Sequence, residues 1–386
     1  MTTKCRIIVF MLVLAGFVSC EERFNPELKP ASQSLIVVDG MISNLPGPYS
    51  LKLSLSTALE NPQYLPLSGF TVTIADNTGF SETLIEMVPG EYQTSFGGMQ
   101  GVIGRQYKVV LVSPVGDQYE STYETLREPT EIDSVYPQLE FQTSDDLLYE
   151  TAGYHFYLNT KEAPRDSTYL LWQMVSTFKY RSDFNTYWVY EGYLRPVFDY
   201  DSLRICYKTE NIQEIFLFST VNLNPPILKD FPLHFVSTDT RELMERYSLL
   251  LRQFSISEDT YKFWRIVKDQ NSNMGDLYSK QPFQVKGNIY NTVNSDEIVL
   301  GNFMVAGVTE KRIYVNRPDP PVQFQYPICE FNEDVYRNFG AIYEFPPSSW
   351  PIFATRGPLG NALPNQWCMD CRQSGGVIEK PDFWIE

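Results

Sequence analysis

Four cysteines beyond the first twenty residues have the type and spacing most suggestive of chemistry. Cys368 and Cys371 form a C-x-x-C pair near the C-terminus, and Cys206 and Cys329 stand apart. Three interpretations are open: two disulfides of unassigned connectivity, a zinc site, or a redox-active dithiol. A redox motif favours a helix N-terminus beside a βαβ pattern, whereas this one lies in a segment rich in Gly and Pro. In an exported chain, an even cysteine set favours disulfides with no free thiol.

Histidine is scarce, which restricts the catalytic machinery that the chain can carry. His155 and His234 are the two histidines, each beside apolar or aromatic neighbours in an expected strand. A Ser/His/Asp triad or a histidine-rich metal site would have to use one of them. The sequence contains no G-x-S-x-G, H-E-x-x-H, P-loop or calcium-loop motif. Carboxylates could supply a glycosidase pair, but abundance alone is weak support. We therefore expect no enzyme activity, no cofactor and no metal site.

A cluster of aromatic residues is the candidate for ligand binding. Tyr187, Trp188 and Tyr190 stand close together in a polar neighbourhood. Such rings combine a large apolar face with a polar tip, which suits contact with a glycan or a peptide. Two interpretations are open: an exposed binding loop, or an irregular strand pair.

The N-terminal residues indicate export and lipid attachment. Lys4 and Arg6 precede an uncharged apolar run over 7–17, which is shorter than the roughly 20 residues that span a bilayer. The run ends at a small residue followed by Cys20, and this pattern resembles the lipobox of bacterial lipoproteins. The resemblance implies that residues 1–19 are a signal peptide and that Cys20 is acylated.

The segment after Cys20 reads as a tether. Residues 20–33 contain two prolines and no hydrophobic periodicity. Glu21 and Glu22 follow the cysteine directly, and this acidic pair resembles the surface-export signal of some outer-membrane lipoproteins. We expect a body anchored to the outer membrane by lipid and exposed at the cell surface, with a periplasm-facing body as the alternative.

Composition points to a β-rich body and away from nucleic acid. The chain has 386 residues, a formal net charge of −16 and no Lys/Arg-rich run, so polyanions would be repelled. Aromatic residues make up 15% of the chain, including 25 Tyr and 25 Phe. Such enrichment favours strands over helices. We expect an all-β protein.

The turn pattern divides the chain into three parts. Short alternating segments at about ten-residue spacing predict an immunoglobulin-like β-sandwich over 34–128. A second β-rich, sandwich-like domain is expected over 129–317, with one inserted helix near 258–271 that Ser257 caps. Residues 318–386 lack periodicity and are expected to be an irregular tail stapled by cysteines.

Several segments together resemble the family known as domain of unknown function 4249. These are Leu35–Ile42, Gly47–Leu53, Tyr247–Ser255, Phe263–Trp264, Gly287–Asn291, Lys311–Ile313, Cys368–Arg372, Gly375–Gly376 and Lys380–Trp384. The resemblance covers nearly the whole chain after Cys20. It implies structural roles for these positions: Gly287, Gly375 and Gly376 for turns, and Trp264, Phe383 and Trp384 for packing.

The resemblance also implies a setting without implying a chemistry. Members look like outer-membrane lipoproteins found beside TonB-dependent receptors of the starch-utilisation (SusC-like) type. We therefore expect a non-enzymatic accessory or ligand-capture partner of such a transporter. The alternative is a surface module that binds glycan or peptide independently of a transporter.

Overall fold

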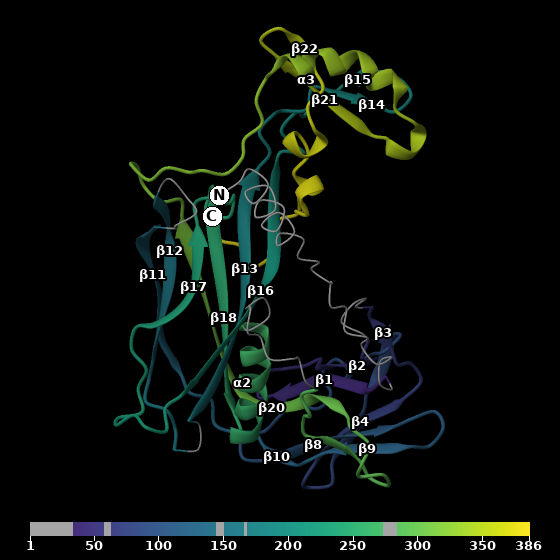
Figure 1. Cartoon of the computed structure of the whole chain (residues 1–386), viewed down its shortest axis with the longest axis vertical. Coiled ribbons are helices and arrows are strands. Elements are labelled where there is room, and N and C mark those ends of the chain that lie inside the picture. The colour runs from purple at the N-terminus through teal and green to yellow at the C-terminus, as the bar shows by residue number, and fades with distance from the viewer. Residues whose placement is uncertain (1–33, 58–62, 144–149, 166–167, 273–283) are drawn as a thin grey trace, which may run out of the picture.

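The computed structural model describes residues 34–57, 63–143, 150–165, 168–272 and 284–386. Strands dominate these residues, and the α-helices among them are α2 (Glu258–Ser272) and the short α3 (Glu333–Arg337). The all-β expectation is confirmed. Two β-sandwiches and a small cap follow one another along the long axis of the molecule (Figure 1).

The first sandwich forms where polar and apolar residues alternate strictly. In β8 (Gln106–Val112), Tyr107, Val109 and Leu111 all point into one core. One of its sheets is built from β19 (Ile289–Asn291), β9 (Gln118–Ser121), β8, β4 (Thr71–Asp76), β5 (Ser81–Thr83) and β10 (Glu124–Thr125). The facing sheet contains β1 (Ile36–Ser43), β2 (Ser50–Leu55), β3 (Leu65–Pro66), β7 (Glu91–Gln93) and β6 (Ile85–Val88).

The second sandwich packs long strands around a core rich in rings. Its larger sheet runs through β16 (Ile205–Ser219), β13 (Tyr169–Arg181), β18 (Arg246–Ile256) and β20 (Leu300–Asn316). The facing sheet contains β11 (Ile132–Thr143), β12 (Glu150–Thr160) and β17 (Phe231–Ser237). Trp172, Phe156 and Tyr247 are fully buried between the two sheets.

Strand β20 belongs to both sandwiches. Its first part, from Leu300 to Ala306, pairs in parallel with β1, and its second part, from Gly307 to Asn316, pairs antiparallel with β18. The large sheets of the two sandwiches are therefore one nine-stranded sheet. A Cβ at Gly307 would lie 2.2 Å from the Arg127 carbonyl oxygen, so only glycine fits where the linker between the sandwiches crosses β20.

The boundaries expected from sequence differ from this arrangement in two places. Strands β19 and the first part of β20 complete the first sandwich, although they lie far beyond residue 128. Strand β20, expected to lie wholly within the second domain, is one continuous strand that belongs to both sandwiches. Local patterns do not report such long-range pairing, because β1 and β20 are about 260 residues apart and β9 and β19 about 170.

Helix α2 covers the junction of the two sandwiches, as Figure 1 shows. It begins where expected: the Ser257 hydroxyl accepts the Thr260 N–H at 3.1 Å, which caps the first turn. Its Tyr261 and Trp264 pack on a small core. This core includes Phe254 of β18, Met304 of β20 and other residues of β13, β18 and β20.

The cap is built from two distant chain segments. It contains the sheet β15 (Leu194–Pro196), β14 (Trp188–Tyr190), β21 (Ile352–Gly357) and β22 (Gly360–Ala362). The first two strands lie in the connection between β13 and β16, and the other two come from the C-terminal segment, together with α3 and four 3-10 turns. Figure 1 shows the cap projecting beyond the ends of β13 and β16. The expected irregular tail therefore also contributes two strands.

Candidate functional site

A crevice of about 1100 Å³ opens at the junction of the two sandwiches. Its walls come from β1 and β2, the turn between them, the middle of β18 and β20, and helix α2; Gln173 of β13 and Asn211 of β16 also line it. We call it the junction crevice. A pocket of this size at an interface between modules is the usual setting for a ligand site.

The floor of the junction crevice is apolar because successive strand residues point to opposite faces. In β20, Phe303 and Val305 enter the first core, so Asn302 and Met304 face the crevice. Phe254 of β18 and Met41 of β1 extend this floor. Methionine side chains are flexible and polarizable, which lets such a floor fit more than one apolar shape.

One wall is held by helix α2. Phe263, Trp264 and Val267 lie at the helical spacing that puts them on one face, and all three line the crevice. The family resemblance implies a packing role for Trp264 on this face of the helix. The structure divides the roles, since Trp264 both packs on the small core below the helix and borders the open space.

Charged residues around the rim form pairs of opposite sign. Arg252 Nε donates to Glu310 Oε1 at 2.6 Å across β18 and β20. Asp39 lies opposite Lys52 across β1 and β2, and Lys52 Nζ binds Glu91 Oε1 at 2.8 Å. The surrounding protein removes water from the Asp39 carboxyl, and this desolvation raises its pKa. The positive charge of Lys52 opposes that rise.

Two buried polar atoms beside the crevice have no hydrogen-bond partner among the described residues. They are Asn302 Oδ1, an acceptor, and Trp264 Nε1, a donor. Only 6% of Asn302 is exposed. No sequence signal singles out Asn302, because its environment depends on β1, which pairs with it from the other end of the chain.

The aromatic residues expected to bind ligand lie in the cap, far from this crevice in the chain fold. Trp188 and Tyr190 belong to β14, which pairs with β21, so the exposed-loop interpretation is wrong and the strand-pair interpretation holds. Tyr190 is 7% exposed, with Tyr343 and Trp350 edge-on to its ring at 5.5 Å. The half-buried Trp188 donates from Nε1 to Asn361 Oδ1 at 3.1 Å.

The ring of Tyr187, the third candidate, is also packed against another side chain. Its ring stacks on Tyr200 at 5.1 Å, and its N–H donates to the Ala354 carbonyl. Exposed rings in this region include Tyr193, which is 65% exposed, and Tyr343, which is 59% exposed; Phe198 is more exposed still, at 88%.

The four cysteines form two disulfides, Cys206–Cys371 and Cys329–Cys368. The disulfide expectation is confirmed, and each member of the C-x-x-C pair belongs to a different bridge. The zinc and dithiol interpretations are therefore wrong for these residues. The first bridge lies in the core of the second sandwich, and the second joins Cys329, ahead of α3, to Cys368 in the 3-10 turn that follows β22.

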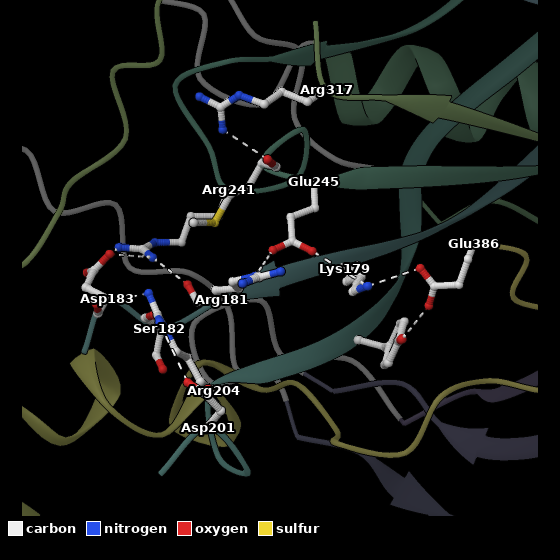
Figure 2. Close-up of polar contacts among 12 residues, drawn as sticks. Lys179, Arg181, Ser182, Asp183, Asp201, Arg204, Arg241, Glu245, Arg317 and Glu386 are labelled. Atoms are coloured by element: carbon white, nitrogen blue, oxygen red, sulfur yellow. Dashed lines mark hydrogen bonds and ion pairs between the residues drawn. The ribbon is translucent and has the colours of Figure 1, made fainter. Parts of the chain in front are cut away.

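An arginine joins the base of the cap to the second sandwich (Figure 2). Arg241 binds the Asp183 carboxylate through two nitrogens, at 3.1 and 2.8 Å, and donates to the carbonyls of Arg181 and Pro327. Asp183 also accepts the N–H of Cys329 at 2.9 Å. This fixed fork geometry is what a guanidinium supplies and a lysine does not.

The polar network continues along the sheet towards the C-terminus. Glu245 lies between Arg181 and Lys179, and Lys179 reaches Glu386 at 3.1 Å, as Figure 2 shows. Next to it, Trp384 is buried between the rings of Tyr207 and Tyr314. The packing role expected for Trp384 agrees with this position.

The two histidines have ordinary structural surroundings. His155 Nδ1 lies 3.0 Å from Glu140 and its ring contacts Tyr157, while His234 Nδ1 lies 3.4 Å from Glu214. Within the described parts of the chain, no three His, Cys, Asp or Glu side chains are placed to hold a metal ion.

The expected lipidation site at Cys20, the signal peptide and the tether lie outside the described residues. No helix in the part of the chain that the structure covers is long and apolar enough to cross a membrane.

Comparison with known proteins gives a family and no activity. The model of a family described as domain of unknown function (DUF4249) matches residues 21–312, well over half of the chain. No curated protein matches the chain. The matched residues include the first sandwich, the second sandwich and the walls of the junction crevice. On this match, the chain belongs to the DUF4249 family.

Proposed function

We propose that this protein is a non-enzymatic, lipid-anchored binding protein of the outer membrane that captures ligand for a TonB-dependent β-barrel transporter. The junction crevice carries the binding part of the proposal. It is large, and it has an apolar floor with a charged rim.

The anchoring part of the proposal is supported by the N-terminal sequence. The apolar run ends at Cys20, and the family match begins at the next residue. Two or more acyl chains give stable anchoring, because each buried methylene contributes about 0.8 kcal/mol. A cell-surface position is supported by Glu21 and Glu22 and places the crevice where a ligand first arrives.

Protease shaving and affinity purification on intact cells test this proposal. A C-terminally tagged chain should lose its tag when cells are shaved, and it should bring a β-barrel receptor with it from detergent-solubilised outer membranes. The Cys20→Ala variant is the matched control and should appear in the soluble fraction. A tagged chain that purifies without any β-barrel protein would contradict the transporter partnership.

A second candidate function is an independent surface module that binds glycan or peptide through the cap. The observation in its favour is the pair of exposed rings, Tyr193 and Tyr343, next to the packed Tyr190 and Trp350. If this function holds, a Tyr193→Ala/Tyr343→Ala double variant should lose retention on a glycan array. Trp188→Phe, which keeps the cap packing, is the control.

A further inference from the structure

The described chain enters the first sandwich at one of its two ends. The Leu35 carbonyl oxygen accepts the Ser56 N–H at 2.8 Å. Ile36 pairs with Leu55 of β2, and Leu55 pairs on its other side with Leu65 of β3. The start of β1, the end of β2 and strand β3 therefore lie side by side. We call this part of the sandwich the entry end.

Three further loops meet at the entry end. A Cβ at Gly90, in the turn between β6 and β7, would lie 2.7 Å from Pro66 Cβ of β3. A Cβ at Gly69, just before β4, would lie 3.4 Å from Pro114 in the turn between β8 and β9. The loop after β19 joins them, because the Thr292 N–H donates to the carbonyl of the first residue of β9 at 2.9 Å.

These loops and β3 bring large apolar side chains to the surface of the entry end. Each is between 39% and 89% exposed, and they are Tyr64, Leu65, Met87, Val88, Val115 and Val293. A single exposed apolar residue is ordinary, whereas a group on one surface marks a contact with a partner or a membrane.

The charges at the entry end argue against a strongly charged partner. Its exposed charged side chains include Asp117 and Asp296, and also Lys286, whose strand neighbour Leu300 lies beside the start of β1. Residues of both signs are therefore present, and the apolar side chains supply the larger part of any attraction.

The length of chain before Ser34 indicates which partner covers this surface. Cys20, the expected lipid attachment site, lies fourteen positions before Ser34, so a fully extended connection reaches at most about 50 Å. An acylated Cys20 would thus hold a bilayer within this distance of the entry end at all times. Such a link raises the effective concentration of the bilayer at the apolar side chains.

The other parts of the molecule lack this connection. Phe80 and Phe96 are also exposed, but the Thr94 N–H donates to the Tyr49 carbonyl, which places Phe96 at the start of β2 and so at the opposite end of the sandwich. The cap, which carries the exposed Tyr193, lies at the far end of the long axis of the molecule (Figure 1).

We propose that the entry end rests on the surface of a lipid bilayer, with Tyr64, Met87 and Val88 inserted among the headgroups. Side chains in this position are buried by about 5–10 Å, and a tyrosine suits it because its ring is apolar and its hydroxyl is polar. This inference rests on the proposed lipid anchor, and it names the face that the anchored protein turns to the membrane.

Tryptophans added one at a time test which part of the molecule touches the bilayer. The lipidated full chain is reconstituted in vesicles of phosphatidylcholine and phosphatidylethanolamine, with and without bromine on the acyl chains, which quenches tryptophan emission. Tyr64→Trp reports on the entry end, Phe96→Trp on the opposite end and Tyr193→Trp on the cap, and the unaltered chain with its six tryptophans gives the background. We expect brominated lipid to quench the emission added at residue 64 and to leave the other two unchanged.

A charged variant tests whether the apolar side chains make the contact. In the Tyr64→Trp chain, Met87→Asp/Val88→Asp should abolish the quenching, because a carboxylate is costly to move into an apolar environment. Phe80→Asp/Phe96→Asp, which introduces the same charges at the opposite end, is the matched control and should leave the quenching intact. Circular dichroism checks that both variants are folded.

Three outcomes would overturn the inference: equal quenching at residues 64 and 96, no quenching at residue 64 in a chain that floats with the vesicles, or quenching that persists in the folded Met87→Asp/Val88→Asp variant. Failure of the anchor is a different result, since an unlipidated chain would not float. The same reporters are then measured on a chain held by an N-terminal polyhistidine tag on nickel-chelating lipid, with the same expected and contrary outcomes. Co-purification of a β-barrel bears on the transporter partnership alone.

Discussion

At the scale of single residues, the buried Glu124 of β10, which contacts the first turn of α2, makes the fold sensitive to pH. Its carboxylate accepts hydrogen bonds from Ser257 at 3.0 Å, Thr260 at 3.2 Å and Asn288 at 3.3 Å. Burial raises its pKa above the ordinary value of 4.5, although these three donors oppose the rise. The folded protein therefore binds this proton more tightly than the unfolded chain does. The stability it contributes is full below pH 4.5 and is lost as the pH rises through the folded-state pKa.

Replacing this carboxyl with an amide should remove that part of the pH dependence. In Glu124→Gln, the free energy of unfolding should rise relative to the unaltered chain as the pH goes from 4.5 towards 7. Urea unfolding at several pH values measures the difference. Glu258→Gln, at an exposed position in the first turn of α2, is the control and should not show this rise. A difference that stays constant with pH would show that the pKa of Glu124 is the same in the folded and unfolded states.

The Arg241–Asp183 pair is the second residue-scale determinant, because it connects the cap to the body. Both side chains are mostly buried, so Arg241→Ala would leave the Asp183 carboxylate with one remaining N–H donor, from Cys329. Breaking a buried ion pair by removing one partner costs about 3–5 kcal/mol. We expect a loss of that order in urea unfolding. Arg195→Ala, which breaks an exposed pair with Glu191, should cost less than about 1 kcal/mol; equal losses in the two variants would refute the anchoring role.

At the scale of elements, the two disulfides differ in accessibility. Cys206 and Cys371 are both fully buried in the core of the second sandwich, whereas Cys329 is only half-buried. Limited reduction should therefore open the Cys329–Cys368 bridge first and loosen the cap before either sandwich. Alkylation followed by peptide mapping identifies the first thiols, and unreduced protein, which should show none from these four cysteines, is the reference. Early labelling of Cys206 would contradict this order.

Some of these elements could be predicted from the sequence, and others could not. The helix after Ser257 and the alternating strands were predictable because caps and periodicity are local signals. The cysteine set was predictable, but its connectivity depends on how the C-terminal segment folds back. Trp188 and Tyr190 looked exposed because their covering strand, β21, comes from more than 160 residues away. For the same reason, the junction crevice and the surroundings of Asn302 could not be predicted from the sequence.

At the scale of the whole molecule, β20 makes the two sandwiches depend on each other. Its Phe303 enters the first core, Met304 and Val308 enter the small core under α2, and Val315 enters the second core. Losing the pairing of one part of this strand removes side chains from the neighbouring core as well. We therefore expect the two sandwiches to unfold as one cooperative unit.

A single glycine in β20 allows this expectation to be tested. Gly301 has φ +89°, and a Cβ there would lie 1.9 Å from the Val38 carbonyl oxygen in β1. Gly301→Ala should therefore disrupt the β1–β20 pairing and cost about 3 kcal/mol or more, since strain in the left-handed region adds to overpacking. Gly340→Ala, where a Cβ meets nothing within 4 Å, is the matched control.

Amide hydrogen exchange measures which strands are destabilised by Gly301→Ala. If the sandwiches are coupled through β20, amide exchange should accelerate by similar factors in β8 of the first sandwich and β13 of the second, although neither strand contains the altered residue. Acceleration confined to β1, β2 and β8 would mean that the sandwiches open independently. The junction crevice would then lie between two separately stable sandwiches, and we would expect ligand binding there to draw them together. If the sandwiches are instead coupled through β20, the walls of the crevice are fixed before any ligand binds.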